Sequence, residues 1–578
     1  MKKIKPSTLA LIGILLAYTI LSFYKLGNIK NPITYTNLKN HQQLIYKIEQ
    51  NKIPYKMMIY NANVESYIRI IYTDNLEEKS SYLYDIDIGM DGGNVFKWRE
   101  EYINHHNNPY KQYLIIESYW DTTTIGEIQL QDQNGTPIKL TPMGDKEKSL
   151  IDEQNTVPKE YSYMNSTYFD EIYFARTAYE MLNGLPVYEY THPPLGKLIM
   201  SIPIAFFGVT PLSYRLCGNI AGILMILIIY LIAKELFKRE RYALFAAAIM
   251  ALDGMHFVQT RIGTVDSFLV LFCLTSFLFF LKYLQQPSEE KIKKKIVSLI
   301  LSGIFWGMAI SVKWTAAFIG LGMGIIYIIK FIIDTIKTKK FEIKLILWSI
   351  LAFIIIPMSI YIASYIPIMN NKNATVYYQE DNNSKGKTIY IHNIETFFQY
   401  QKVMYKYHSE LTAEHPYSSP WYDWPIMKKP MWFYIGRFQD ESVGTIACMG
   451  NPAVWWIGIV TTTFTLIYTL IKRDKEGAIL IAMIAATWLT YAKIGRIMYI
   501  YHYFITLPFV MLTIIFTISK LAKWKKQIDY IIPALTLLFL CNFIYFYPIY
   551  SGKPVSIDYI KKTEWQETWI YDGLPREE

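Results

Sequence analysis

The chain has 578 residues, and its 58 Lys and Arg against 48 Asp and Glu give a formal net charge of +10. Hydrophobic residues make up 52% and charged residues 18%, whereas soluble globular domains carry about 25% charged residues. Many of the apolar blocks reach the roughly 20 residues that cross about 30 Å of hydrocarbon. The composition excludes a soluble enzyme, a disordered chain and a fibrous repeat, and it predicts a polytopic α-helical membrane protein.

The apolar blocks predict about eleven membrane spans. The first follows Lys2, Lys3 and Lys5, lacks a cleavage signal, and is expected to be a retained anchor rather than a removed signal peptide. The expected spans are 7–25, 213–233, 243–257, 264–281, 296–312, 314–333, 345–367, 453–471, 477–492, 497–519 and 528–549.

The basic residues predict the orientation of these spans. If the N-terminus is cytoplasmic and the spans alternate, the Lys/Arg clusters in 234–241, 291–295, 337–340, 472–475 and 523–526 all fall on the inner side. The tight outer hairpins then contain few cations: Arg261, Lys313, Lys493 and Arg496. We therefore expect a multi-pass protein of the cell membrane whose N-terminus is cytoplasmic and whose active site and C-terminus are extracytoplasmic. The positive charge follows membrane topology and indicates no nucleic-acid partner.

The predicted organisation starts with a first transmembrane helix in 1–27. An extracytoplasmic β-sandwich-like insertion follows in 28–160, where Asn134-Gly135 between two apolar runs is typical of a two-residue hairpin turn. An outer loop with an acidic pair and amphipathic helices is expected in 161–212. Transmembrane bundles in 213–367 and 451–549 flank an aromatic extracytoplasmic loop in 368–450, and an extracytoplasmic tail covers 550–578.

The first candidate site is the acidic pair Asp170-Glu171, at the start of a predicted amphipathic helix in 169–182. Adjacent carboxylates point in different directions on a helix and both gain from the positive end of its dipole. One of them could accept a proton from an attacking hydroxyl. The alternative is an N-cap and a first-turn acid without a chemical role.

A second motif, Thr191-His-Pro-Pro-Leu-Gly-Lys197, precedes an apolar run. His192 offers a polar edge on a backbone that two prolines fix. Alternatively, the motif is a rigid turn into the membrane, with Lys197 extending its ammonium group to the interface.

Other ionisable residues lie at the predicted outer ends of spans. An ionisable residue at membrane depth requires a function or a partner. Arg261 and Asp266 are close in sequence, so they could bind a ligand together or pair with each other. Lys313 has no carboxylate beside it in the sequence, and Arg496 is followed by a segment rich in tyrosine that contains His502. Either cation alone could anchor a helix. Several on one face favour an anionic lipid headgroup.

At these motifs the sequence resembles the dolichyl/polyprenyl-phosphate-mannose–protein mannosyltransferases, which form glycosyltransferase family 39 of the GT-C superfamily. The long 28–160 insertion and the short 368–450 loop resemble a bacterial branch of this family. The matching stretches occur in the family's order, and they are Phe169-Asp-Glu171, Thr191–Lys197, Arg261–Ser267, Gly307–Trp314, His415-Pro-Tyr417 with Pro420-Trp421, Gly450–Trp456 and Tyr501-His-Tyr503.

The resemblance implies transfer of mannose, or a similar hexose, from a polyprenyl-phosphate donor in the membrane to Ser/Thr hydroxyls of exported proteins. It implies that Asp170 is the general base and that Glu171 orients the acceptor or the sugar. Developing phosphate charge needs preorganised cations. The implied residues around the lipid phosphate and sugar are His192, Lys197, Arg261, Asp266, Lys313, His415, Arg496 and His502. No cofactor is expected, and a divalent metal is left open.

Two other functions fit parts of this pattern. A related GT-C enzyme could place a lipid-borne sugar on a lipid or cell-wall glycan, with the inserted domain binding that glycan. A transporter or flippase would favour inverted repeats and broken helices near mid-membrane. The sequence shows no such repeat, and its ionisable residues collect at one face, so the transferase is the favoured interpretation.

Overall fold

The computed structural model describes residues 5–62, 67–76, 83–87, 95–103, 111–118, 123–373, 375–378, 387–438 and 440–571. The last seven residues of the predicted tail, 572–578, lie outside the described residues. The chain forms two compact units. We call residues 25–179 and 201–215 the β unit, and residues 1–24, 180–200 and 216–578 the helical unit.

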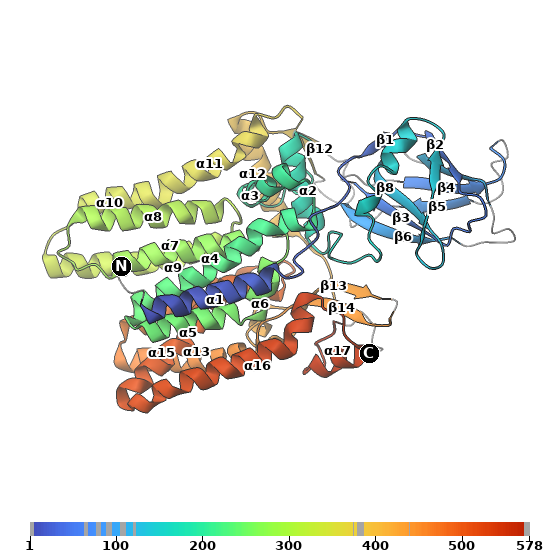
Figure 1. Cartoon of the computed structure of the whole chain (residues 1–578). Coiled ribbons are helices and arrows are strands. Elements are labelled where there is room, and N and C mark those ends of the chain that lie inside the picture. The colour runs from blue at the N-terminus through green and yellow to red at the C-terminus, as the bar shows by residue number, and fades with distance from the viewer. Residues whose placement is uncertain are drawn as a thin grey trace. The chain divides into compact units, whose positions relative to one another are not determined.

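The β unit contains two five-stranded antiparallel sheets (Figure 1). Apolar side chains from both sheets form one core that includes Tyr46, Ile59, Ile70, Leu114 and Ile128. An extracytoplasmic β-rich insertion was predicted from the sequence, and the separate β-rich unit is confirmed. One sheet has the order β1 (Thr36–Leu38), β8 (Thr123–Gln131), β3 (Lys56–Asn61) and β6 (Lys97–Tyr102), with β9 (Pro137–Ile138) on β8; the other has the order β10 (Leu140–Pro142), β2 (Gln43–Ile48), β7 (Tyr113–Ser118), β4 (Tyr67–Thr73) and β5 (Leu83–Asp87).

The hairpin around Asn134-Gly135 exists, but its loop is longer than the two residues expected. Strands β8 and β9 pair through Gln131 and Pro137, so five residues connect them. The Asp132 carboxylate accepts hydrogen bonds from the backbone N–H groups of Asn134 (2.9 Å) and Thr136 (2.8 Å). Gly135 has φ +75°, where a β-carbon would be strained. These hydrogen bonds to the Asp132 side chain stabilise a five-residue loop in place of the expected two-residue turn.

The helical unit is mostly α-helix, and α2, α3 and α4 contribute residues to both units. A π-helical turn, Leu351–Ile355, joins α10 to α11. The helices are α1 (Pro6–Phe23), α2 (Glu171–Asn183), α3 (Leu195–Phe207), α4 (Pro211–Phe237), α5 (Glu240–Ala251), α6 (Gly254–Thr260), α7 (Asp266–Leu284), α8 (Ile292–Ile310), α9 (Ala316–Thr338), α10 (Ile343–Ile350), α11 (Ile356–Met369), α12 (Ile394–Glu410), α13 (Pro452–Lys472), α14 (Lys475–Trp488), α15 (Leu507–Trp524), α16 (Ile531–Ser551) and α17 (Ile557–Thr563).

Two short antiparallel pairs complete the helical unit. Strands β11 (Thr375–Tyr378) and β12 (Lys387–Tyr390) form one pair, and β13 (Met431–Arg437) and β14 (Val443–Cys448) form the other. Both belong to the region that was predicted as an aromatic loop.

Eight helices among the described residues are long and apolar enough to cross a membrane, or nine if the bent pair α5 and α6 is one span. The chain is therefore a multi-pass membrane protein, but the expected count of eleven is not confirmed. The expected span 243–257 falls on α5 and α6, which meet at 62°. The expected span 477–492 falls on α14, which has 14 residues, and the expected span 296–312 falls on α8, which is not among the eight.

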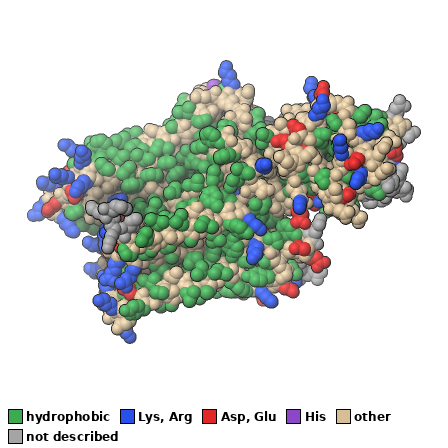
Figure 2. All heavy atoms as spheres, in the orientation of Figure 1, with side chains coloured by type: hydrophobic (Ala, Val, Ile, Leu, Met, Phe, Trp, Pro, Cys, Tyr) green, Lys and Arg blue, Asp and Glu red, His purple; other side chains and the backbone are tan. Residues whose placement is uncertain are grey.

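The surface of the helical unit is largely hydrophobic between its ends, and Lys and Arg side chains gather at one end (Figure 2). Contacts link the loops at that end. Lys238 hydrogen-bonds Gln285 (2.7 Å), and Arg241 forms a salt bridge with Asp529 (2.7 Å). This distribution is the one that the positive-inside rule predicts for a bundle with one cytoplasmic face.

Close helix packing in the bundle depends on Gly303 of α8. A β-carbon at this position would overlap the carbonyl oxygen of Ala352 in the π-helical turn. Small residues allow membrane helices to approach at backbone distance. At Gly324 of α9, by contrast, a β-carbon would meet no atom within 4 Å.

We expect Gly303→Ala to lower the stability of the protein by about 1–3 kcal/mol, because the added methyl group must push α8 away from the π-helical turn. Thermal unfolding of the detergent-purified protein measures this effect. Gly324→Ala is the matched control, and it should unfold at or slightly above the wild-type temperature. Equal unfolding temperatures for the two variants would contradict the close approach.

Candidate active site

Asp170 lies at the N-terminus of α2. Its carbonyl oxygen accepts hydrogen bonds from the N–H groups of Tyr173 (3.0 Å) and Phe174 (3.1 Å), which makes it the residue that caps the helix. Phe169 before it adopts φ 47°, in the left-handed region. The side chain of Asp170 is partly exposed, and its position at the positive end of α2 stabilises a carboxylate.

Glu171 differs from its neighbour because it is completely buried and paired with Arg215 of α4. The guanidinium Nε lies 2.6 Å from Oε1 of Glu171 and Nη2 lies 2.7 Å from Oε2. The backbone N–H of Tyr168 also donates to Oε2, at 3.1 Å. Both carboxylate oxygens are thus occupied, and the expectation that Glu171 orients the acceptor or the sugar receives no support from its surroundings.

Arg215 has a wider structural role. Its remaining N–H groups donate to the carbonyl oxygens of Leu26 (2.8 Å), Tyr163 (2.8 Å) and Ser166 (3.1 Å). The bidentate pair therefore ties the start of α2 to α4 and to two loops of the β unit. Sequence reasoning missed Arg215, although an arginine within an apolar span is a signal that it has a partner.

The Thr191–Lys197 turn is fixed by a buried ion pair. The Lys197 ammonium group donates to Oε2 of Glu189 (2.5 Å), to the Glu189 carbonyl (2.9 Å) and to the His192 carbonyl (2.8 Å). These bonds use all three of its N–H donors. Lys197 therefore stabilises the turn through Glu189 and the His192 carbonyl. Its contacts give no support to the expectation that it binds the donor.

Glu189 also orients His192, whose Nδ1 lies 2.9 Å from Oε1 of Glu189. Burial alone would raise the pKa of the Glu189 carboxyl, but the adjacent Lys197 and His192 hold it well below its ordinary value. Glu189 therefore remains ionised and fixes the position of the imidazole. Sequence reasoning missed Glu189, which lies two residues before the motif.

Lys313, Arg496, His192, His408 and His502 influence one another electrostatically, and we call these five residues the cation cluster. The Lys313 ammonium group lies 3.0 Å from Oδ1 of Asp266, at the first residue of α7, and 5.8 Å from the centre of the Tyr501 ring. Of the eight residues that the resemblance implied around the lipid phosphate and sugar, the structure brings together Asp266, Lys313, Arg496, His192 and His502, and their roles there stay predictions.

His408 of α12 connects Arg496 to the Thr191–Lys197 turn. Its Nε2 lies 2.6 Å from the Thr191 carbonyl oxygen, and its Nδ1 contacts Nη1 of Arg496. A neutral imidazole satisfies both contacts, by donating from Nε2 and accepting at Nδ1. Burial, together with the nearby His192, Arg496 and Lys313, lowers the pKa of His408 to about 3.

His502, in the 3₁₀ helix Ile500–Ile505, is likewise neutral near pH 7. Burial and the nearby Lys313 and Arg496 lower its pKa well below the ordinary value. The positive charge of the cluster therefore resides on Lys313 and Arg496, and the histidines contribute oriented N–H groups. Because Asp266 offsets only one of these charges, the cluster has a net positive charge.

His415 approaches this region through aromatic rings. Its imidazole packs against Tyr499 with ring centres 5.2 Å apart, Tyr499 stacks on Tyr501 at 5.4 Å, and Tyr501 stacks on His502 at 4.8 Å. His415 Nδ1 accepts a hydrogen bond from the Tyr417 N–H (3.2 Å). This places His415 beside the edge of the cluster.

Arg261 makes contacts that the sequence did not predict. Its guanidinium donates to the carbonyl oxygens of Ser22 (3.0 Å) and Tyr24 (2.9 Å) and lies 4.7 Å from the centre of the Phe257 ring. A cation at the last carbonyl groups of a helix satisfies acceptors that have no partner within the helix. Arg261 thus holds the C-terminal end of α1, while Asp266 pairs with Lys313 rather than with Arg261.

One group of carboxylates in the β unit could in principle hold a metal ion: oxygen atoms of Glu127, Asp152 and Glu153 lie within 4.8 Å of one another. Their existing contacts are structural. Glu153 accepts hydrogen bonds from the N–H groups of Ile33 and Thr34 (both 2.9 Å), and Glu127 accepts from the N–H of Glu153 (3.1 Å). Burial raises the pKa of Glu127 to about 7.

Two family models match the helical part of the chain. Residues 203–370 match the dolichyl-phosphate-mannose–protein mannosyltransferase family, and residues 393–569 match the C-terminal four-transmembrane region of protein O-mannosyltransferases. The chain belongs to the protein O-mannosyltransferase family.

Curated relatives of this mannosyltransferase family extend over most of the chain. A polyprenol-phosphate-mannose–protein mannosyltransferase of Mycolicibacterium smegmatis is 24% identical over 69% of this chain and 87% of its own length. A protein of the same name from Mycobacterium tuberculosis is 21% identical over 69% of this chain and 86% of its own length.

A solved structure shares the fold. The Saccharomyces cerevisiae protein O-mannosyltransferase Pmt1–Pmt2 complex bound to the sugar donor matches with a TM-score of 0.60 and 14% identity, over 70% of this chain and 89% of that chain. The predicted family and the membrane-embedded fold are therefore confirmed.

We expect Arg215→Met to destabilise this protein O-mannosyltransferase by about 3–5 kcal/mol, because the variant leaves the Glu171 carboxylate buried without a partner. The unfolding temperature in detergent measures the loss. The double variant Glu171→Gln/Arg215→Met removes the stranded charge and should recover part of it. A single variant that unfolds at the wild-type temperature would contradict the role of this pair.

Proposed function

We propose that this protein transfers mannose from a polyprenyl-phosphate donor to Ser or Thr hydroxyls of exported proteins, with inversion at the anomeric carbon. The observation that carries the proposal is the cation cluster, in which Lys313 pairs with Asp266, Arg496 contacts His408, and the three histidines are neutral. A phosphate at the headgroup plane of a lipid has the charge and depth that such a site accommodates. The family of the chain and the names of its relatives support the same activity.

The leaving group of this reaction is the lipid phosphate. As the bond between the anomeric carbon and the phosphate oxygen breaks, its electron pair stays on that oxygen and adds negative charge to the phosphate. Lys313 and Arg496 are held by Asp266 and His408 before the donor arrives. Donors that are fixed in advance stabilise developing charge without reorganisation.

The acceptor hydroxyl must lose its proton as it forms the new bond to the anomeric carbon. We assign this proton to Asp170, because it is the partly exposed member of the acidic pair, whereas Glu171 is fully buried against Arg215. Glu171 is then a positioning residue that fixes the first turn of α2. The oxygen attacks from the face opposite to the phosphate, which gives inversion.

The distribution of charge favours an orientation for the chain. The end of the helical unit where Lys and Arg gather faces the cytoplasm in this proposal. The N-terminus is then cytoplasmic, and the cation cluster faces the cell exterior, where exported acceptors and the sugar-bearing end of the donor meet.

We expect Asp170→Asn to lower the rate of transfer by about 10²–10⁴-fold, because the amide cannot accept the proton. Transfer of radiolabelled mannose from a synthetic polyprenyl-phosphate donor to Ser/Thr peptides measures the rate, and a lipid or glycan acceptor tests the alternative activity. Glu395→Gln, at an exposed acid in the first turn of α12, is the matched control. Near-normal turnover by Asp170→Asn would remove it from the role of base.

Lys313→Met and Arg496→Gln should each weaken donor binding by about 10–100-fold, the size of a lost hydrogen bond to a charged group. A binding titration with the unhydrolysed donor measures this loss. Lys337→Met, at an exposed lysine in the last turn of α9, should bind the donor normally.

The double variant Asp266→Asn/Lys313→Met separates charge from folding, because it leaves no carboxylate without its partner. It should bind the donor as weakly as Lys313→Met alone. Restored binding in the double variant would mean that the unpaired Asp266, and not the missing cation, had caused the defect.

A further inference from the structure

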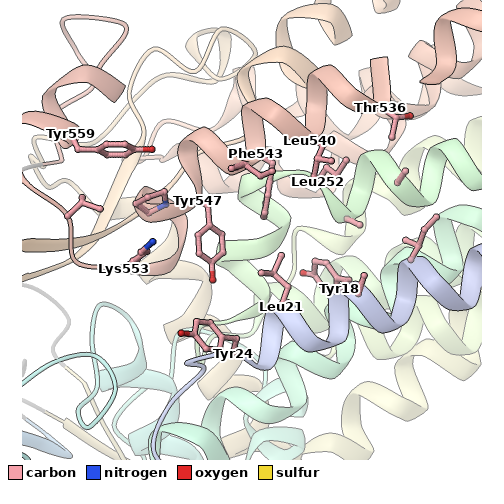
Figure 3. Close-up of a pocket in the computed structure, with 17 residues that line it drawn as sticks. Tyr18, Leu21, Tyr24, Leu252, Thr536, Leu540, Phe543, Tyr547, Lys553 and Tyr559 are labelled. Atoms are coloured by element: carbon pink, nitrogen blue, oxygen red, sulfur yellow. The ribbon is translucent and has the colours of Figure 1, made fainter. Parts of the chain in front are cut away.

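A lateral groove of about 800 Å³ lies between α1, α5 and α16 of the helical unit, apart from the cation cluster (Figure 3). Its volume is in the range of small-molecule sites. The walls are lined by apolar side chains, among them Ile14, Leu21, Leu252, Leu540 and Phe543.

Polar groups are concentrated at one end of this groove. Figure 3 shows Lys553, Tyr547, Tyr24 and Tyr559 toward one end, and Thr536 at the other. Lys553 is exposed, and among the residues that the structure describes its ammonium group forms no salt bridge. An apolar groove that ends at a cation has the polarity of a lipid with an anionic headgroup.

The groove also has the length of one membrane leaflet. From Thr536 to Tyr547 the helix rises about 16 Å at 1.5 Å per residue. The hydrocarbon of one leaflet is roughly 15 Å thick, half of about 30 Å. An acyl chain that follows α16 would therefore place its phosphate beside Tyr547 and Lys553.

Two of the three helices that border the groove, α1 and α16, are largely exposed at the surface of the helical unit. Only 17% of the α1 span and 17% of the span that contains α16 are buried within the protein. The hydrocarbon around these helices has direct access to the groove. Lipid chains fill an apolar opening of this kind at a lower free-energy cost than water does.

We propose that this groove binds one anionic glycerophospholipid, with an acyl chain between α1, α5 and α16 and its phosphate at Lys553. The lipid would connect the first and last membrane helices of the chain. Phosphatidylglycerol supplies the required chemistry, and the site does not depend on the proposed transferase activity.

Native mass spectrometry of the full-length protein in detergent, titrated with dioleoyl phosphatidylglycerol, tests the proposal. Wild type should retain one phosphatidylglycerol and bind it at least about fivefold more tightly than dioleoyl phosphatidylcholine. Lys553→Glu should weaken phosphatidylglycerol binding by about tenfold or more. Lys561→Glu, at an exposed lysine of α17 outside the groove, should not.

A second pair of variants tests the apolar part. Ala17 is an exposed residue of α1 that lines the groove, and Ala17→Trp should exclude the acyl chain; Leu16→Trp, at an exposed neighbour outside the lining, should leave binding unchanged. Undecaprenyl phosphate tests the other lipid source.

Three results would overturn the proposal. The first is equal phosphatidylglycerol binding by the wild type and by the Lys553→Glu and Ala17→Trp variants. The second is displacement of the phospholipid by undecaprenyl phosphate at equal concentration. The third is dimerisation of the wild type that Ala17→Trp abolishes. The last result would identify the groove as an interface with a second copy of the chain.

Discussion

The buried ion pair between Arg215 and Glu171 is the interaction on which the position of the Asp170-Glu171 acidic pair depends. Arg215 donates to both Glu171 oxygens and to three backbone carbonyls, and these bonds fix the first residue of α2. Asp170 is the residue directly before this first turn, so the same contacts determine where it lies. The two adjacent carboxylates therefore differ: Glu171 is buried and paired with Arg215, whereas Asp170 is partly exposed at the N-terminus of α2.

Charged side chains in the helical unit are fixed by partners in the same way. Ionisable groups near the site are held by partners: Lys197 by the nearby Glu189, and Lys313 and Arg496 by Asp266 and His408, which are distant in sequence. Desolvated ions that lack a partner are costly. These partners fix the geometry before a ligand arrives, and they leave excess positive charge where the donor phosphate is proposed to bind.

The sequence predicts the parts of this protein that local patterns encode. Apolar blocks and basic loops reveal the membrane helices, and Asp170, His192, Lys313 and Arg496 are recognisable from their motifs. The number of spans was less accessible, because α5 and α6 form one bent segment and α14 is short. The lengths of such helices depend on tertiary packing rather than on composition.

Pairing partners could not be predicted for a related reason. His408 contacts Arg496 across 88 positions of sequence, and Glu171 contacts Arg215 across 44. No local spacing relates the members of these pairs. The motifs that contain Lys197 and Arg261 do not reveal the partners that these residues have in the structure, which are the Glu189 carboxylate for Lys197 and the carbonyl oxygens of Ser22 and Tyr24 for Arg261.

The neutral state of His408 has a consequence for the environment in which the protein works. A group with a pKa of about 3 when folded, and near 6.5 when unfolded, takes up no proton in the native protein under mildly acidic conditions. Between these two values the unfolded chain binds the proton and the folded chain does not, so acid shifts the folding equilibrium toward the unfolded state. Mild acidification of the surroundings would therefore lower the free energy of unfolding while leaving the charge at His408 in the folded protein unchanged.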